Sequence, residues 1–388
     1  MTRFSLAGLA TVLLAGAVSA QDPVLALQNQ GRPQIDAAIA KSATCTKDKL
    51  QVRREWGDLS KAERRAYIDA MLCIMSKPSR LDPQQYPGAK SRYDDFVVVH
   101  MNQTMTIHGT GNFLSWHRWY TWAFERALQT ECGYNGTQPY WDWSRWYEDP
   151  ESSPIFDGSD TSLSGNGEKI DHTMSPGIPV GNGGGCVKTG PFKDMVITLG
   201  PMAPVINPAP PRNPRADGYG YNPRCLRRDI SNILSRQNLR PQDVASLITG
   251  SNNIGSFQDT MQAVGGFGGG FPGFPGGGQQ QFIMGVHGAG HYTISGDPGG
   301  DFYTSPNDPA FYVHHAMIDR TWYIWQSLNF ESRKFVIAGG TSMMGWGSPL
   351  ATLDDPIHLG PPGLIADTTY HIRDLVSTVD GPFCYIYE

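Results

Sequence analysis

Six histidines constrain the fold of this 388-residue chain more than any other feature, because they form two groups that lie far apart in the sequence. The groups are His100, His108 and His117, and then His287, His291 and His315. The i, i+4 spacing of His287 and His291 projects two imidazoles from one face of a helix, as metal chelation requires. If both groups serve one centre, the segments that carry them must meet in space. The sequence therefore predicts a single domain built around a metal site.

Segments with helical periodicity carry most of these histidines. Helices are predicted at residues 60–75, after a capping box formed by Ser91 and Asp94, at residues 113–132, around residues 281–292, and after Asp308 with Pro309 as the first helical residue. In the helix at 113–132, His117 lies on an apolar stripe that repeats at spacings of three and four, which is typical of a core-facing surface.

In the last of these helices, His315 is predicted to be a ligand and its neighbour His314 is not. His315 lies on the apolar stripe that starts at Phe311 and continues through Ile318. His314 is rotated by about 100° from it, because an α-helix has 3.6 residues per turn. A ligand to a buried metal must lie on the core-facing side. His314 is therefore predicted to pack against the site or to support a ligand.

The residues around the histidines select among possible metals, since imidazole binds copper, zinc, iron and nickel alike. A zinc protease needs glutamate directly after the first histidine of its pair, whereas Gly288, Ala289 and Gly290 fill that interval here. An iron site with two histidines and one carboxylate needs an acidic ligand, and none accompanies the first group. Three neutral nitrogens per metal favour copper. The hypothesis is a dinuclear copper site.

The first twenty residues have the layout of a cleaved secretory signal peptide, with an apolar run at 6–18 followed by small residues. The predicted mature chain, residues 21–388, has no stretch of the length that a transmembrane helix needs. The net charge of −5, without a basic run, argues against nucleic acid or anionic membrane as a partner, because both bind clustered lysine and arginine. The sequence predicts an exported, soluble protein.

The six cysteines suit disulfides in an oxidising compartment. Fifteen pairings are possible, and Cys186 with Cys225 is a candidate because this pair would close an irregular stretch between residues 144 and 236. Sequons at Asn102 and Asn135 would accept glycans in a eukaryotic secretory pathway.

Glycine and proline are abundant, at 45 and 29 residues, so much of the chain is predicted to be loop around a compact core. Residues 265–278 are almost wholly glycine, phenylalanine and proline, without helical or strand period. This run lies just before His287. It is either a rim of the site's opening or a solvent loop without a role.

Several motifs in combination resemble the type 3 copper proteins, the family of tyrosinases, catechol oxidases and haemocyanins. The motifs are His100 with His108, Trp116-His117-Arg118, Pro139-Tyr140-Trp141-Asp142-Trp143, His287-x-x-x-His291, and Asp308-Pro309-x-Phe311-Tyr312-x-x-His315-x-x-x-Asp319. The resemblance covers nearly the whole mature chain. It implies a mainly α fold, in which a four-helix bundle encloses the site and long disulfide-stapled loops with little β-structure surround it. It assigns the first histidine group to copper A and the second to copper B, with dioxygen as co-substrate.

The C-terminal Tyr385-Ile386-Tyr387 looks like the paired-tyrosine motif that closes the family's catalytic domain. In the family this motif packs against an arginine near the N-terminus, for which Arg53 and Arg54 are the candidates. Many relatives continue into a lid domain after the motif, whereas this chain stops at Glu388. The resemblance therefore predicts a short, lidless, secreted form of fungal type.

Departures from the family pattern narrow the expected activity. Thr106 stands where many fungal relatives have a cysteine bonded to the middle copper A histidine, so no such thioether can form. Tyrosinases commonly have asparagine after the first copper B histidine and a glutamate upstream, whereas this chain has Gly288 and only glutamines at 279–281. Both differences remove base assistance and favour a catechol oxidase.

Five further residues receive expected roles around the copper ions. Asn307 and Asp319 are predicted to accept the second N–H of ligating imidazoles, as oxygen atoms around metal sites commonly do. Gly288, Tyr292 and Phe302 are assigned to the substrate pocket, with Phe302 either a gate over copper A or a packed loop residue.

The resulting hypothesis is a secreted oxidase that converts o-diphenols to o-quinones while reducing dioxygen to water. A tyrosinase that hydroxylates monophenols and an o-aminophenol oxidase are the alternatives within the class. A haemocyanin-like oxygen carrier and a structural metal site are alternatives of other classes. Carriers are usually large assemblies with a covered site, and the short lidless chain argues against one.

Overall fold

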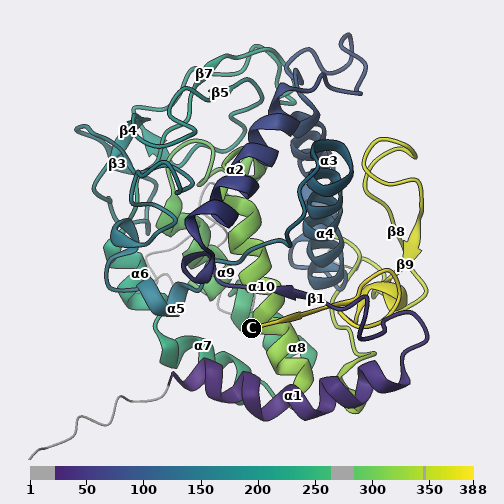
Figure 1. The fold of residues 1–388 in the computed structure, drawn as a ribbon. Coiled ribbons are helices and arrows are strands. Elements are labelled where there is room, and N and C mark those ends of the chain that lie inside the picture. Colours follow the sequence, from purple (N-terminus) through teal and green to yellow (C-terminus); the bar gives the residue numbers. More distant parts are fainter. Residues whose placement is uncertain (1–21, 264–283, 344–346) are drawn as a thin grey trace, which may run out of the picture.

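The computed structural model describes residues 22–263, 284–343 and 347–388, and it is mainly helical, as predicted (Figure 1). The predicted signal peptide and the run at 265–278 lie outside the described residues. The α-helices are α1 (Pro23–Lys41), α2 (Lys61–Ser76), α3 (Arg92–Ile107), α4 (Phe113–Cys132), α5 (Trp143–Trp146), α6 (Asn232–Asn238), α7 (Pro241–Gly250), α8 (Ile254–Gln262), α9 (Val286–Ile294), α10 (Ala310–Ser327) and α11 (Phe330–Arg333).

The strands of the described residues are short and pair only in twos. They are β1 (Gln51–Arg53), β2 (Gly167–Lys169), β3 (Thr173–Met174), β4 (Gly184–Val187), β5 (Val196–Ile197), β6 (Ile206–Asn207), β7 (Arg224–Cys225), β8 (Pro356–Ile357), β9 (Tyr370–His371) and β10 (Tyr385–Tyr387). Single 3-10 turns complete the structure at η1 (Trp56–Asp58), η2 (Pro150–Ser152), η3 (Ser305–Asn307) and η4 (Ile372–Leu375). The prediction of little β-structure is confirmed.

Helices α2 and α3 begin with reciprocal caps. Ser60 accepts a hydrogen bond from the backbone N–H of Glu63, whose carboxylate accepts one from the N–H of Ser60. Ser91 and Asp94 make the same pair of contacts, so the predicted capping box is confirmed. Each cap satisfies N–H groups that have no partner within the helix. Both helices pack against α4, and α4 packs against α10 to form the bundle.

Helix α10 is the centre of the fold, and every one of its residues is buried. It contacts α1, α4, α7 and α9, and it runs through the middle of the molecule in Figure 1. A helix that exposes no face to solvent must be enclosed by other elements on all sides. It begins at Ala310, one residue later than predicted. Asp308 accepts a hydrogen bond from the N–H of Ala310, and its carboxylate also pairs with the buried Arg228 at 2.7 Å.

Helix α9 also differs from its predicted bounds. The helix spans Val286–Ile294, whereas the sequence predicted one around 281–292. Residues 281–283 lie outside the described chain, and Met284 and Gly285 are not helical. The glycines that interrupt the apolar pattern hide the helix from periodicity arguments.

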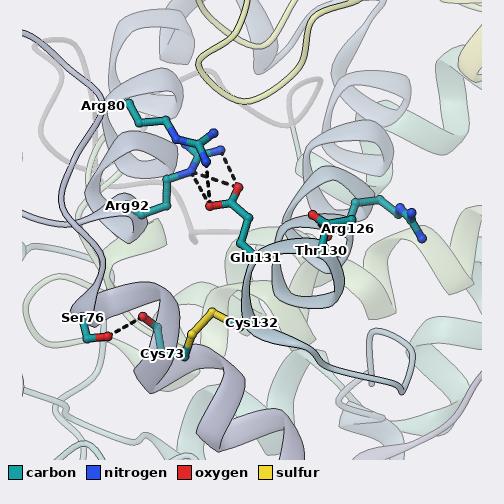
Figure 2. The surroundings of a disulfide bond; sticks show 8 residues. All are labelled: Cys73, Ser76, Arg80, Arg92, Arg126, Thr130, Glu131 and Cys132. Carbon is teal, nitrogen blue, oxygen red and sulfur yellow. Dashed lines mark hydrogen bonds and ion pairs between the residues drawn. A yellow bond between two sulfur atoms is a disulfide. The ribbon is translucent and has the colours of Figure 1, made fainter.

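Three disulfides join distant segments: Cys45–Cys384, Cys73–Cys132 and Cys186–Cys225. The last confirms the predicted closure of the irregular stretch. Figure 2 shows Cys73–Cys132, which ties α2 to the end of α4, beside Glu131 and its two arginine partners. Those partners are Arg80 at 2.9 Å and Arg92 at 3.2 Å.

Strand β1, near the N-terminus, pairs in parallel with the C-terminal strand β10, with Arg53 opposite Tyr387. The Arg53 guanidinium stacks 3.7 Å from the ring centroid of Tyr385 and donates to the Tyr387 hydroxyl at 3.1 Å. Arg53 is therefore the arginine that packs against the paired tyrosines, whereas Arg54 pairs with Glu63 near the surface. Among the described residues, no helix is long and apolar enough to cross a membrane.

Candidate metal centre

The first histidine group converges from three positions around the start of α4. His100 lies on α3, His108 directly follows the last residue of α3, and His117 lies in the second turn of α4. All three side chains are buried. Each residue offers one ring nitrogen, and these three nitrogens lie within 4.8 Å of one another.

Backbone carbonyls fix the orientation of these three rings. The Nδ1 atom of His100 donates to the carbonyl of Tyr303 at 2.9 Å, and that of His108 donates to the carbonyl of Thr104 at 2.9 Å. The Nδ1 atom of His117 donates to the carbonyl of Phe113 at 2.8 Å. A carbonyl oxygen only accepts, so each Nδ1 carries the proton and each Nε2 keeps its lone pair. The Nε2 atoms of His100 and His117 are buried without a hydrogen-bond partner. Orphaned buried acceptors of this kind suit a metal ion.

Burial also holds the imidazoles neutral. Desolvation lowers the pKa of His100 to about 3 and that of His108 to about 4, with the neighbouring His108 as a second cause for His100. An imidazole must be neutral to ligate a metal, because the proton of the charged form occupies the lone pair. The first group is therefore ready to bind a metal at neutral pH.

The second group faces the first across the bundle. His287 and His291 lie on α9 and His315 lies on α10. The Nε2 atoms of His291 and His315 are 3.1 Å apart, and the Nε2 atom of His287 is buried without a partner. The rings of His117 and His315 stack with centroids 4.5 Å apart. The structure thus brings together all six histidines singled out by the sequence.

His314 lies close enough to the second group to count as a possible ligand by distance alone. Its hydrogen bonds argue otherwise. Its Nδ1 accepts from the indole N–H of Trp143 at 3.2 Å, so its Nε2 carries the proton and donates to the carbonyl of His287 at 3.1 Å. Both nitrogens are occupied, and His314 supports the backbone that carries a ligand candidate. Trp143 stood in a quoted motif without an assigned role.

Gly290 makes room for this arrangement. A Cβ atom at Gly290 would lie 2.2 Å from Cε1 of His314, closer than any real contact. Gly290 is thus required by the close approach of α10 to α9. Periodicity could not show this, because the reason is a contact with another helix.

We expect Gly290→Ala to displace His314 and to lower both thermal stability and copper occupancy. Overpacking of this kind costs roughly 1–3 kcal/mol. Gly288→Ala is the matched control on the same helix, since its Cβ would meet only the flexible Met284 side chain at 3.3 Å and, more distantly, Tyr292. Calorimetry and elemental analysis of both variants provide the comparison. Equal melting temperatures for the two variants would refute the packing argument.

Of the two side chains predicted to accept from imidazoles, Asp319 has other partners. Asp319 accepts from Arg118 at 2.6 Å and from the hydroxyls of Tyr385 and Tyr387 at 2.6 Å each, and the structure shows no contact from it to an imidazole. Asn307 is buried, and its amide nitrogen has no partner among the described residues. Backbone carbonyls take this role for the three imidazoles of the first group, and the role of Asn307 stays a prediction.

The predicted pocket residues Gly288, Tyr292 and Phe302 line one narrow pocket above His108, His287 and His291. The Phe302 ring packs against His108, with ring centroids 4.7 Å apart. Gln262, at the end of α8, lines the same pocket. No sequence pattern marks Gln262, because it lies outside every histidine motif.

Both predicted sequons have exposed asparagines. Asn102 lies on α3, where its amide oxygen accepts from the hydroxyl of Tyr219. Asn135 follows the end of α4. Glycosylation of either residue stays a prediction.

Comparison with known proteins decides the family. A family model described as the common central domain of tyrosinase matches residues 90–328, which include all six histidines. The chain belongs to the tyrosinase family. It is 40% identical over 353 residues to tyrosinase P of Aspergillus terreus, covering 88% of this chain and 92% of that one. It is 36% identical over 373 residues to the N-acetyl-6-hydroxytryptophan oxidase ivoB of Emericella nidulans, covering 91% and 96%.

A solved tyrosinase-family structure has the same fold. It is a glycine-to-asparagine mutant of a polyphenol oxidase from Thermothelomyces thermophila, with a TM-score of 0.82 and 38% identity, and the match covers 94% of this chain and 98% of that one. The predicted family and fold class are therefore confirmed. The donor set also fits the metal of a tyrosinase-family oxidase, since six imidazoles without thiolate or carboxylate suit copper.

Proposed function

We propose that this chain is a dicopper oxidase that converts o-diphenols to o-quinones. His100, His108 and His117 would hold copper A, and His287, His291 and His315 would hold copper B. The observation that carries the proposal is the pair of buried imidazole groups, with Nε2 atoms left unpartnered on both sides of the site. Two-metal sites use ions about 3.5 to 4 Å apart, which facing ligand groups can supply.

Copper supplies the redox chemistry when bound, taking electrons from the diphenol and passing them to dioxygen. Two catechols are oxidised for each dioxygen that is reduced to two waters, so electrons and protons balance. The chain holds neutral imidazoles in fixed orientations and limits access through a narrow, largely apolar pocket. Phe302 packs against His108 at the wall of this pocket.

The pocket lacks a free carboxylate, which favours catechols over monophenols. Asp301 is the one acidic residue that lines it among the described residues. One Asp301 oxygen accepts from the N–H groups of Met202 and Ala203, and the other accepts from those of Tyr303 and Thr304. Burial raises the pKa of Asp301, but four N–H donors already engage its two oxygens, so the carboxylate is poorly placed to take a proton from substrate. Gly288 adds no polar side chain either.

We expect Gly288→Asn to raise the rate on a monophenol relative to that on a catechol. A monophenol must lose its proton before its oxygen can bind copper, and a phenol with a pKa near 10 is mostly protonated at neutral pH. An asparagine amide can position a histidine or a water as base. The Cβ of this residue would lie 3.3 Å from the flexible Met284 side chain, so the substitution fits.

Initial rates of the wild type, Gly288→Asn and Gly288→Ala on one catechol and one monophenol check this expectation. Gly288→Ala adds the Cβ without the amide, so its rate ratio should remain that of the wild type. A wild type that hydroxylates the monophenol as fast as it oxidises the catechol would refute the subtype while leaving the copper site intact.

Spectrophotometric assays with a catechol, a monophenol and an o-aminophenol test the proposed function. Quinone formation from the catechol at the highest kcat/KM supports it. Faster turnover of the monophenol identifies a tyrosinase, and faster turnover of the o-aminophenol identifies an o-aminophenol oxidase. Reversible dioxygen binding without turnover of any substrate identifies an oxygen carrier.

We further propose that residues 21–388 form one exported catalytic domain. The signal-like residues 1–20 and three disulfides support this proposal, because disulfides persist in oxidising compartments. The partners expected are small phenols, and neither nucleic acid nor a membrane is expected. Mass spectrometry of the protein secreted by its host tests the cleavage site and the two sequons together.

A further inference from the structure

Gln262 carries an amide group that no residue of the described chain uses in full. Its Oε1 accepts from the backbone N–H of Gly109 at 2.9 Å. Only the oxygen of a glutamine amide can accept, so this contact fixes which end of the amide faces Gly109. The NH₂ group makes no hydrogen bond to the described residues, and the residue as a whole is 6% exposed. Gln262 lines the pocket over the histidines.

Tyr292 presents a second group of the same kind. The residue is 8% exposed, lines the same pocket, and makes no hydrogen bond through its hydroxyl to the described residues. Neither polar group is among the fully buried atoms without a partner, so both groups are open to the pocket and are not used by the protein. Two unpaired groups that face one pocket indicate a ligand with complementary polar atoms.

The chemistry of the pocket limits what that ligand carries. The amide NH₂ only donates, so its partner must be an acceptor oxygen. No lysine, arginine or unengaged carboxylate lines the pocket among the described residues. A charged substituent would therefore be desolvated without a counter-charge, which is costly. A neutral carbonyl is the acceptor that satisfies the donor without this cost.

We propose that Gln262 determines specificity by donating a hydrogen bond to a neutral carbonyl on the ring substituent of the substrate. The substrate class is then catechols whose side chain bears an amide, ester or ketone. This inference rests on the proposed catechol oxidation. Gln262 acts on the substituent, away from the reacting hydroxyls, so its effect is a difference between substrates.

Three catechols measure that difference in the wild type: N-acetyldopamine, 4-methylcatechol and dopamine. The first bears a neutral carbonyl, the second an alkyl group and the third an ammonium. We expect kcat/KM to fall in that order, with N-acetyldopamine ahead of 4-methylcatechol by roughly 3- to 10-fold, as one hydrogen bond provides. A dopamine value above that of N-acetyldopamine would overturn the proposal. Absence of oxidation of all three would instead refute the proposed function.

Gln262→Glu is the variant of choice, because it keeps an oxygen for the N–H of Gly109 and replaces the donor by an acceptor. The ratio of kcat/KM for N-acetyldopamine to that for 4-methylcatechol should fall by roughly 3- to 10-fold. The ratio of kcat/KM for dopamine to that for 4-methylcatechol should rise. Ratios within one variant cancel any general loss of activity. Tyr292→Phe, which removes only the hydroxyl, is the comparison. A ratio lowered by Tyr292→Phe and unchanged by Gln262→Glu would assign recognition to the tyrosine and sink the proposal.

Discussion

Replacing His315 by alanine is expected to remove about half of the bound copper and to abolish catechol oxidation while the fold persists. Removing a residue that only hydrogen-bonds to a ligand lowers activity by roughly 10- to 100-fold. The expected loss for His315→Ala is larger, because the ligand itself is removed. The bundle core and the three disulfides do not depend on this imidazole. Copper content by elemental analysis, together with circular dichroism, measures both parts of the expectation.

His314→Ala is the matched control, since it removes the adjacent imidazole of the same helix. His314 binds the carbonyl of His287 and the indole of Trp143, so its loss should weaken copper affinity by roughly 10- to 100-fold yet leave both ions bound at saturating copper. The opposite pattern, in which His314→Ala loses one ion and His315→Ala keeps both, would show that the ligand assignment is wrong.

Asp319→Asn is expected to destabilise the protein by about 3–5 kcal/mol, the cost of breaking a buried ion pair on one side. Asp319 is 3% exposed and pairs with Arg118 at 2.6 Å and with Arg53 at 3.4 Å. The variant would leave the buried Arg118 without an ion-pair partner among the described residues and would leave Arg53 with Glu125 alone. Urea unfolding followed by fluorescence measures the change.

Asp36→Asn provides the control for this prediction, because Asp36 pairs with Arg32 on the surface. An exposed pair contributes about 0–1 kcal/mol. A loss for Asp319→Asn no larger than that for Asp36→Asn would contradict the role of the buried network. Such a result would mean that the paired tyrosines alone hold the two chain ends together.

The pH dependence of this network has a definite sign. Burial by itself would raise the pKa of Asp319, but Arg118 and Arg53 more than offset it and hold that pKa below its ordinary value. A carboxylate with a depressed folded-state pKa stabilises the protein fully above its unfolded pKa, and the contribution is lost as the pH falls through the folded value. The stability of Asp319→Asn should therefore fall less on acidification than that of the wild type.

Local patterns predicted the parts of the site that local physics determines. The capping box at Ser91 depends on spacing within one helix, and the structure has it. The apolar stripe through His315 does not mark one buried side of α10, because every residue of that helix is buried. Copper-site motifs with fixed spacing located the six histidines. The choice of His315 over His314 followed from helix geometry alone, and the hydrogen bonds of His314 now give it an independent reason.

Features that depend on contacts between distant segments were not predictable. Every residue has a backbone carbonyl, so no sequence pattern marks Tyr303 or Thr104 as a partner of an imidazole. Asp319 lies in one of the histidine motifs, and it was therefore predicted to accept a hydrogen bond from a ligating imidazole. One of its partners, Arg118, lies on α4. The others, Arg53, Tyr385 and Tyr387, come from the β1–β10 pairing, which joins residues more than 300 positions apart. Gln262 belongs to the same class, because only the folded chain places it over the histidines.

The central claim is that two facing histidine groups make a copper oxidase, and oxygen consumption by the copper-loaded protein tests it most directly. Protein with a measured copper content is given excess catechol in an oxygen electrode while quinone is followed by absorbance. The account predicts about two copper ions per chain, as a two-metal site requires, and one dioxygen consumed for every two catechols oxidised. Two bound copper ions with no catechol-dependent oxygen consumption, or full activity with a single metal ion per chain, would contradict it.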